Sequence, residues 1–125
     1  MIENAFRLEI ASWERDLSDL RAVRETVFVV EQQVPVEEEW DALDPASVHV
    51  IARDDHGRPI GTGRLTPERK IGRMAVLREW RGRGVGDAML RTLLEQARAR
   101  HWPGVSLNAQ LAAIPFYQRA GFAIE

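Results

Sequence analysis

The segment that decides the fold runs from Lys70 to Arg100 and reads KIGRMAVLREWRGRGVGDAMLRTLLEQARAR. It opens as a short alternating run in which Ile71, Met74 and Val76 can face a core, and this pattern predicts a strand. It closes with apolar residues at spacings of i, i+3, i+4 and i+7, which predict a helix: Met89, Leu90, Leu93, Leu94 and Ala97. Between strand and helix lies a turn of glycine and arginine.

This turn has the composition of an anion site. Glycines let backbone N–H groups approach a phosphate, and the start of the following helix adds unpaired donors and the positive end of its dipole. A P-loop is excluded because no Lys-Ser or Lys-Thr pair follows Gly86. The glycine spacing is GxGxG, whereas a dinucleotide-binding turn has GxGxxG in an early βαβ unit.

Three separate segments carry a resemblance to one family. Arg81–Gly86 (RGRGVG), placed after a strand that ends in Met74-Ala75-Val76, resembles the acyl-CoA pyrophosphate loop of the GNAT N-acetyltransferase superfamily. Arg24–Asp41 (RETVFVVEQQVPVEEEWD) resembles the R-x-x-VFVxEQ-x-x-P opening of the ElaA-like subgroup. Leu107–Phe122 (LNAQLAAIPFYQRAGF) resembles the GNAT segment with a strand Asn followed by A-x-x-FY-x-x-x-GF. Together they cover about half of the chain.

The resemblance implies an α/β (α+β) fold with a mixed, mostly antiparallel central sheet flanked by helices. The patterns place strands at Phe6–Ile10, Val48–Asp54, Ile60–Thr66, 70–76 and Val105–Asn108, helices from Leu17 to about Val34 and at Ala112–Ala120, and a turn at 54–59. Gly61 and Gly63 inside a strand predict a bulge or a close backbone contact.

We expect one domain, 1–125, that is truncated at its C-terminus. Family members continue past the GF phrase with two more strands, whereas this chain stops at Glu125, three residues after Phe122. The last strands of the sheet are therefore expected to be missing or shortened. The open edge left beside Val105–Asn108 would favour pairing with another copy, so a homodimer is also an expectation.

Composition narrows the class of function. Apolar content of 45% and charged content of 29% are ordinary for a globular domain, and a net charge of −2 disfavours nucleic-acid binding. No cysteine is present, so a thiolate nucleophile is excluded, and the three histidines, which we expect on the surface or in strands, lack metal-ligand spacing: His49, His56 and His101. We therefore expect no metal. No apolar run could span a bilayer and no signal peptide is evident, which favours the cytoplasm.

The charges are distributed unevenly along the chain. Six basic residues surround the glycine turn: Arg69, Lys70, Arg73, Arg78, Arg81 and Arg83. Six acidic residues fill a stretch without a basic one: Glu31, Glu37, Glu38, Glu39, Asp41 and Asp44. A solvated loop explains the acidic stretch at least as well as a site does. The alternative is that a basic half for a polyphosphate and an acidic half for a cationic amine form one active cleft.

The resemblance implies that acetyl-CoA is the cosubstrate and that a small amine or lysine side chain attacks it directly in a ternary complex. The residues implied in cofactor binding are Met74, Ala75, Val76, Arg81, Gly82, Arg83, Gly84, Val85, Gly86, Asn108 and Arg119. Within this set, backbone groups near Val76 would pair with the pantetheine arm and polarise the thioester. Asn108 would contact the pantetheine, or else turn the chain, and Arg119 would reach the 3′-phosphate, or else be solvated.

Two residues are candidates for the chemistry. The resemblance implies that Tyr117 protonates the leaving thiolate, although a buried tyrosine with a satisfied hydroxyl would have the same sequence pattern. Glu31, in the VFVVEQ match, is the first candidate for the base, and an exposed helix-end carboxylate is equally consistent with its position. The competing functions are a non-catalytic acyl-CoA-binding or regulatory module and, less favoured, a nucleic-acid binder.

Overall fold

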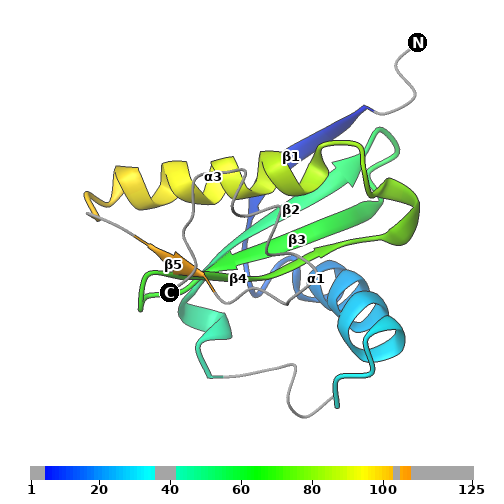
Figure 1. Ribbon diagram of the computed structural model, residues 1–125, viewed down its shortest axis with the longest axis horizontal. Helices are drawn as coiled ribbons and strands as arrows, with labels where there is room; N and C mark the ends of the chain where they lie inside the picture. The colour runs from blue at the N-terminus through cyan, green and yellow to red at the C-terminus, as the bar shows by residue number, and fades with distance from the viewer. Residues whose placement is uncertain (1–4, 36–41, 103–104, 108–125) are drawn as a thin grey trace.

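The computed structural model describes residues 5–35, 42–102 and 105–107, and these form a sheet with the order β1-β2-β3-β4-β5 (Figure 1). The strands are β1 (Phe6–Ala11), β2 (Val48–Asp54), β3 (Pro59–Leu65), β4 (Lys70–Val76) and β5 (Ser106–Leu107). β1 to β4 are antiparallel to their neighbours, whereas β5 is parallel to β4. The mixed, mostly antiparallel sheet predicted from the sequence is therefore confirmed.

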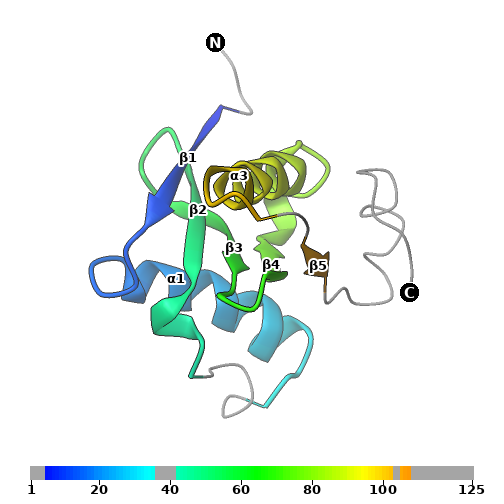
Figure 2. The ribbon, with the colours of Figure 1, turned by 90° about the vertical axis from the view of Figure 1, so that its left-hand side faces the viewer.

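Helices cover both faces of this sheet (Figure 2). They are α1 (Leu17–Arg24), the π-helix η1 (Glu25–Glu31), the short 3-10 helices η2 (Asp44–Ala46) and η3 (Arg78–Trp80), and α3 (Val85–Ala99). α3 buries its predicted apolar face against one side of the sheet, and α1 with η1 packs on the other side. Buried apolar side chains on both sides supply the hydrophobic stabilisation.

The turn between β2 and β3 forms as its composition predicts. The Asp54 carboxylate accepts hydrogen bonds from the backbone N–H groups of His56 and Arg58, each at 2.9 Å. Gly57 has a φ of +83°, a left-handed conformation that glycine adopts without the clash of a Cβ. These local interactions set the register of the hairpin.

The close contact predicted from the strand glycines is present. A Cβ added to Gly63 would lie 2.5 Å from the sulfur of Met74, and one added to Gly61 would lie 3.1 Å from Val85. Opposite Gly63, β4 inserts one extra residue, and Arg73 takes a φ of +51° there. This bulge explains why Ile71 and Met74, three positions apart, can share a face of the sheet.

The same bulge follows the two residues of β4 that pair with β5. Within the described part of the chain, β5 pairs with β4 only at Lys70 and Ile71. Farther along, the N–H of Leu77 donates to Ile60 O (2.9 Å), so the alternation of an antiparallel pair directs the N–H and C=O of Val76 away from β3. The outer edge of β4, the edge away from β3, therefore presents backbone groups of Val76.

The predicted elements agree with the structure to within a residue or two at most boundaries. The helix predicted from Leu17 to about Val34 begins at Leu17 but changes to a π-helix after Arg24 and ends at Glu31. The predicted helix at 112–120 lies outside the described residues, as does the predicted incomplete end of the sheet. In the part of the chain that the structure describes, no helix is long and apolar enough to cross a membrane.

Candidate active site

The glycine loop of the sequence prediction is open to solvent. Arg81, Gly82, Arg83 and Gly84 are all exposed, and they connect η3 to the first residue of α3, Val85. Gly82 and Gly84 have φ values of +77° and +84°, and a Cβ at either position would meet no atom of the described residues within 4 Å. The space in front of both glycines is therefore free for a ligand, and left-handed backbone explains why glycines occur here.

The start of α3 has donors to offer. Gly84 is its N-cap residue, and among residues 5–35, 42–102 and 105–107 no side chain caps the helix. The first N–H groups of a helix have no partner within it, and its dipole places partial positive charge there. The one acidic side chain of the first turn, Asp87, forms an ion pair with Arg91 farther along the helix (2.9 Å). This loop has the properties required of a diphosphate site.

A bidentate ion pair joins this loop to the end of η1. Glu31, the last residue of η1, accepts two hydrogen bonds from Arg81, from Nη1 to Oε2 (2.6 Å) and from Nη2 to Oε1 (2.7 Å). The Nε of Arg81 donates to the carbonyl oxygen of Val76 at 3.0 Å. Three of the five N–H donors of this guanidinium are therefore committed to the protein.

The ion pair changes the acid–base properties of both partners. The hydrogen bonds from Arg81 lower the pKa of Glu31, and Arg78, 4.0 Å away, acts in the same direction. The carboxylate of Glu31 in turn raises the pKa of Arg81. A carboxylate with a lowered pKa is a weaker base, so the pairing weakens the prediction that Glu31 deprotonates an amine.

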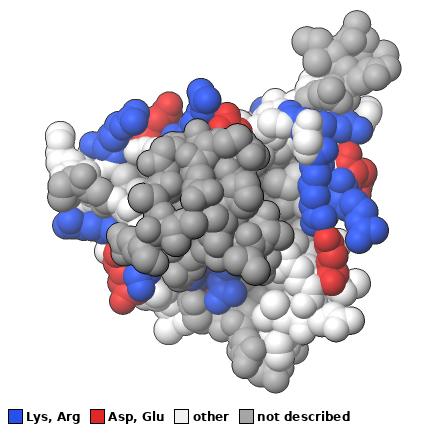
Figure 3. All heavy atoms as spheres, in the orientation of Figure 1, with Lys and Arg blue, Asp and Glu red and all other residues white. Residues whose placement is uncertain are grey.

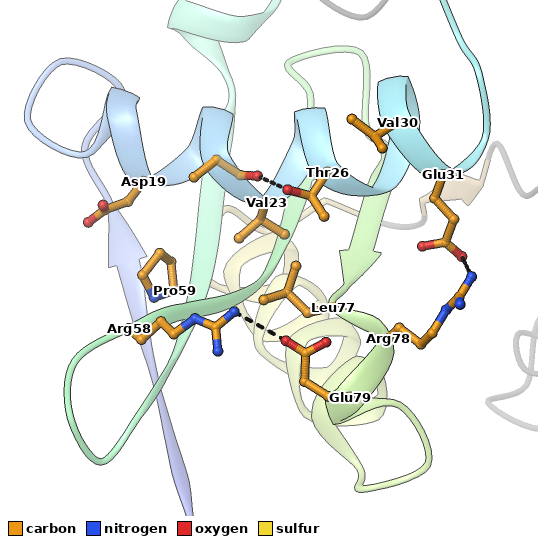
Figure 4. Close-up of a pocket in the computed structure, with 11 residues that line it drawn as sticks. Asp19, Val23, Thr26, Val30, Glu31, Arg58, Pro59, Leu77, Arg78 and Glu79 are labelled. Carbon is orange, nitrogen blue, oxygen red and sulfur yellow. Dashed lines mark hydrogen bonds and ion pairs between the residues drawn. The ribbon is translucent and has the colours of Figure 1, made fainter.

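Beside this ion pair runs a groove of about 820 Å³ between the α1–η1 helix and the connection from β4 to η3 (Figure 4). Its apolar lining includes Val23, Val30 and Leu77, and the exposed fraction of Val30 is 74%. Arg58 and Glu79 face each other across its rim at 3.2 Å. Of its lining, Glu31 and Arg78 were singled out from the sequence, whereas the apolar wall and the Arg58–Glu79 pair were not predicted.

Two predictions about charge need correction. Arg69 lies at the start of β4, over the ring of Trp102 (5.5 Å), and the strand of seven residues separates it from the glycine loop at the other end. At about 3.3 Å per residue this separation is about 20 Å, so the basic residues do not form one cluster. Figure 3 shows acidic side chains interspersed with the basic ones on the face that it presents.

The acidic half of the predicted cleft is also different. The exposed fraction of Asp44 is only 1%, and its carboxylate binds the side chains of Arg24 (2.9 Å) and Arg64 (3.0 Å). It therefore cannot attract a cationic amine. Glu31, from the same stretch, is paired with Arg81, and Glu37, Glu38, Glu39 and Asp41 lie outside the described residues, as do Asn108, Tyr117 and Arg119.

Sequence reasoning missed the partners of two site residues for a physical reason. Glu31 and Arg81 are 50 positions apart, and nothing local in either segment indicates that they meet. For Arg24 there was a signal, because it falls four positions after Leu20, on the apolar face of the helix. A buried arginine requires a carboxylate, and a search for that carboxylate would have led to an acidic residue elsewhere in the chain.

Comparison with known proteins agrees with this geometry. The family model described as the acetyltransferase (GNAT) family matches residues 9–122. The uncharacterized N-acetyltransferase YjcF of Bacillus subtilis is 40% identical over 118 residues, which cover 92% of this chain and 84% of the relative. The crystal structure of Escherichia coli ElaA is similar with a TM-score of 0.81 and 27% identity, over 95% of this chain and 88% of ElaA.

An acyl-CoA N-acyltransferase from Pseudomonas aeruginosa has a TM-score of 0.82 and 28% identity, over 97% of this chain and 90% of that structure. These similarities assign the chain to the fold of the acyl-CoA N-acyltransferases. The chain belongs to the acetyltransferase (GNAT) family, and it is an acetyltransferase.

Proposed function

We propose that the chain moves an acetyl group from acetyl-CoA to a primary amine by direct attack within a ternary complex. The observation that carries the proposal is the juxtaposition of two features: the uncapped, open start of α3 and the outer edge of β4 that ends beside it. The first suits a diphosphate, and the second suits an amide-containing arm that pairs like an added strand.

The residues for holding acetyl-CoA follow from these two features. Main-chain N–H groups of Gly82, Gly84 and Gly86 would surround the diphosphate, and the exposed Arg83 would add charge-assisted bonds. The N–H of Val76 would hydrogen-bond the thioester carbonyl as negative charge develops on its oxygen. Loss of one such donor typically removes about 3 kcal/mol of transition-state stabilisation. Asn108 is proposed to contact the pantetheine and Arg119 the 3′-phosphate.

The reaction balances without a covalent enzyme intermediate. The amine nitrogen attacks the thioester carbon, the C–N bond forms as the C–S bond breaks, and the sulfur leaves as a thiolate. Tyr117 is proposed to give its phenolic proton to that thiolate, while the amine loses a proton to a base or to water. Since an alkyl amine is neutral only about once in 2,500 molecules at pH 7, assistance with this proton accelerates the reaction.

The acceptor class is a small amine or a lysine side chain, and the proposed compartment is the cytoplasm. A homodimer, in which a second copy pairs beyond β5, is also part of the proposal. Titration calorimetry with acetyl-CoA tests the first part of the proposal: absence of binding would refute it. A thiol-release assay against a panel of amines tests the second part, and binding without release for any amine would favour a non-catalytic acyl-CoA-binding module.

Replacement of Tyr117 by Phe tests the proposed acid. We expect kcat with the best amine of the panel to fall by about a hundredfold, because proton transfer by a positioned group contributes at least that much. The KM for acetyl-CoA should change little, since the hydroxyl acts on the leaving thiolate. Unchanged turnover at every pH would show that another group supplies the proton.

A further inference from the structure

We propose that Glu31 is a positioning residue that acts through Arg81 on the end of β4, so that the pair prepares the strand edge for acetyl-CoA. The inference rests on the proposed function, because that edge is where acetyl-CoA is proposed to bind. It replaces direct proton abstraction as the role of Glu31.

The first argument is connectivity. Arg81 binds Glu31 through both terminal nitrogens (2.6 and 2.7 Å) and binds the carbonyl oxygen of Val76 through Nε (3.0 Å). A single guanidinium therefore joins the end of η1, the end of β4 and the glycine loop. Its planar, rigid fork fixes the direction of all three hydrogen bonds together.

The second argument is the direction of the groups held. Val76 lies opposite Gly61 in a non-hydrogen-bonded pair, so its C=O and N–H both point away from β3. Arg81 occupies the C=O, and the N–H is the donor proposed for the thioester. By holding the C=O of Val76, the Glu31–Arg81 pair also fixes the orientation of its N–H.

The third argument is that few other contacts of the described chain hold the outer edge at the end of β4. β4 carries a bulge with Arg73 at a φ of +51°, and β5 accompanies it only at Lys70 and Ile71 among the described residues. Beyond the bulge the outer edge has no strand of the described chain beside it. A bidentate ion pair from the neighbouring helix provides an anchor at that position.

The fourth argument concerns the π-helix. An η1 with i→i+5 bonds, such as that from the N–H of Gln32 to Val27 O (3.0 Å), widens the last turns and shifts side-chain directions relative to an α-helix. Glu31 is the last residue of this segment. The local geometry therefore sets where its carboxylate meets Arg81.

The test is a double-mutant cycle with two readouts. The variants are Glu31→Ala, Arg81→Ala and the double variant, each titrated with acetyl-CoA by calorimetry and assayed for thiol release with the best amine of the panel. We expect each single variant to raise the Kd for acetyl-CoA about five- to tenfold. The double variant should be no worse than Arg81→Ala, because Glu31 acts only through Arg81.

A general base predicts a different result. Glu31→Ala would then bind acetyl-CoA like the wild type, would lose kcat and the acidic limb of its pH–rate profile, and would lose them in the Arg81→Ala background as well. That outcome would overturn the inference. Failure of the wild type itself to bind acetyl-CoA would refute the proposed function and the inference together, whereas wild-type binding that neither variant weakens would refute the inference alone.

Two further variants keep the test specific. Glu79→Ala removes the exposed ion pair with Arg58 (3.2 Å) at the same groove, and its Kd for acetyl-CoA should stay within twofold of wild type. Arg81→Lys keeps the charge but cannot make the fork and the Val76 bond at once, so it should resemble Arg81→Ala. Full recovery with lysine would mean that charge alone suffices and would count against positioning.

Discussion

The buried carboxylate of Asp44 accepts hydrogen bonds from two arginine side chains. Arg24 donates to both of its carboxylate oxygens (2.9 and 3.4 Å), and Arg64 donates to one of them (3.0 Å). All three side chains are at least nine-tenths buried. Such a cluster joins helix α1, the η2 segment and strand β3, and its stability depends on retention of the carboxylate.

Replacement of Asp44 by Asn should therefore destabilise the protein by about 3–5 kcal/mol, because it leaves buried guanidinium groups without their counter-charge. Urea unfolding measures this difference. The matched control is Glu79→Gln, which breaks an exposed pair and should change the free energy of unfolding by no more than about 1 kcal/mol. Equal effects of both variants would show that burial of the cluster contributes nothing.

His49 packs against the same cluster. Its Nε2 lies 2.8 Å from the carbonyl oxygen of Asp44, and its ring stacks on Trp13 with 4.9 Å between centroids. Burial lowers the pKa of His49, and the charges of Arg24 and Arg64 act in the same direction, against the opposing effect of Asp44. The folded state therefore holds this imidazole neutral at pH values where the unfolded chain already binds a proton.

The sign of the resulting pH dependence follows from linkage. As pH falls below about 6.5, the unfolded state takes up a proton that folded His49 refuses, so the free energy of unfolding declines by at most about 1.4 kcal/mol per pH unit. His49→Gln should flatten this decline between pH 7.5 and 5.5 in urea titrations. An unchanged decline in the His49→Gln variant would contradict the assignment.

Local patterns predicted which residues are buried better than which residues pair. The spacing of Leu20 and Val27 identified the apolar face of the first helix, and both are buried. The partner of Arg24 and the fate of Asp44 could not be predicted, because ion pairs between distant segments depend on how the helix crosses the sheet. The sequence likewise does not indicate that Glu31 and Arg81, two opposite charges 50 positions apart, form an ion pair.

At the scale of elements, the start of α3 offers a comparison between two glycines in the same conformation. Gly84 (φ +84°) lies in the proposed diphosphate loop, whereas Gly57 (φ +83°) lies in the β2–β3 turn. An alanine at either position is strained by about 1–3 kcal/mol. Only at Gly84 would the new Cβ also enter the space in front of the loop, where the described part of the chain has no atom within 4 Å.

We therefore expect Gly84→Ala and Gly57→Ala to lower thermal stability by similar amounts, whereas only Gly84→Ala should weaken acetyl-CoA binding, by about tenfold or more. Calorimetry gives the affinities, and thermal unfolding gives the stabilities. A similar loss of affinity in both variants would mean that backbone strain, rather than steric access to the loop, governs binding.

The strands and the long helix could be predicted because alternation and helical spacing are local properties. Gly61 and Gly63 indicated the close contacts on β3, because a missing side chain leaves room for a neighbour, but the bulge in β4 was not predicted. The π-helix could not be predicted, because VFVVE has ordinary helical spacing and the wider turn depends on tertiary packing.

At the scale of the whole molecule, Arg53 connects three elements. It binds Glu9 on β1 (2.5 Å), Asp19 on α1 (2.8 Å) and Asp16 just before that helix (3.4 Å). The opposite end of α1–η1 is fixed to the glycine loop by Glu31. The helix is therefore tied at both ends across the sheet, and a ligand at the loop would reinforce one of these ties.

Acetyl-CoA at a hundred times its Kd should add about 2.7 kcal/mol to the free energy of unfolding, because it binds only the folded state. For a domain of this size we expect Tm to rise by roughly 10 °C in thermal unfolding. Pantetheine, which lacks the diphosphate, is the control and should produce a much smaller shift at the same concentration. Equal shifts would place the main affinity away from the glycine loop.

The contact between Arg83 and Trp80 has an optical consequence. The guanidinium carbon lies 4.9 Å from the centre of the indole ring, and the ring is almost fully enclosed. An anion that draws Arg83 toward itself would alter the electric field across that indole, and its fluorescence spectrum would shift. Trp80 is thus an intrinsic fluorescent probe of the loop, and ligand binding could be followed by tryptophan fluorescence without labelling the protein.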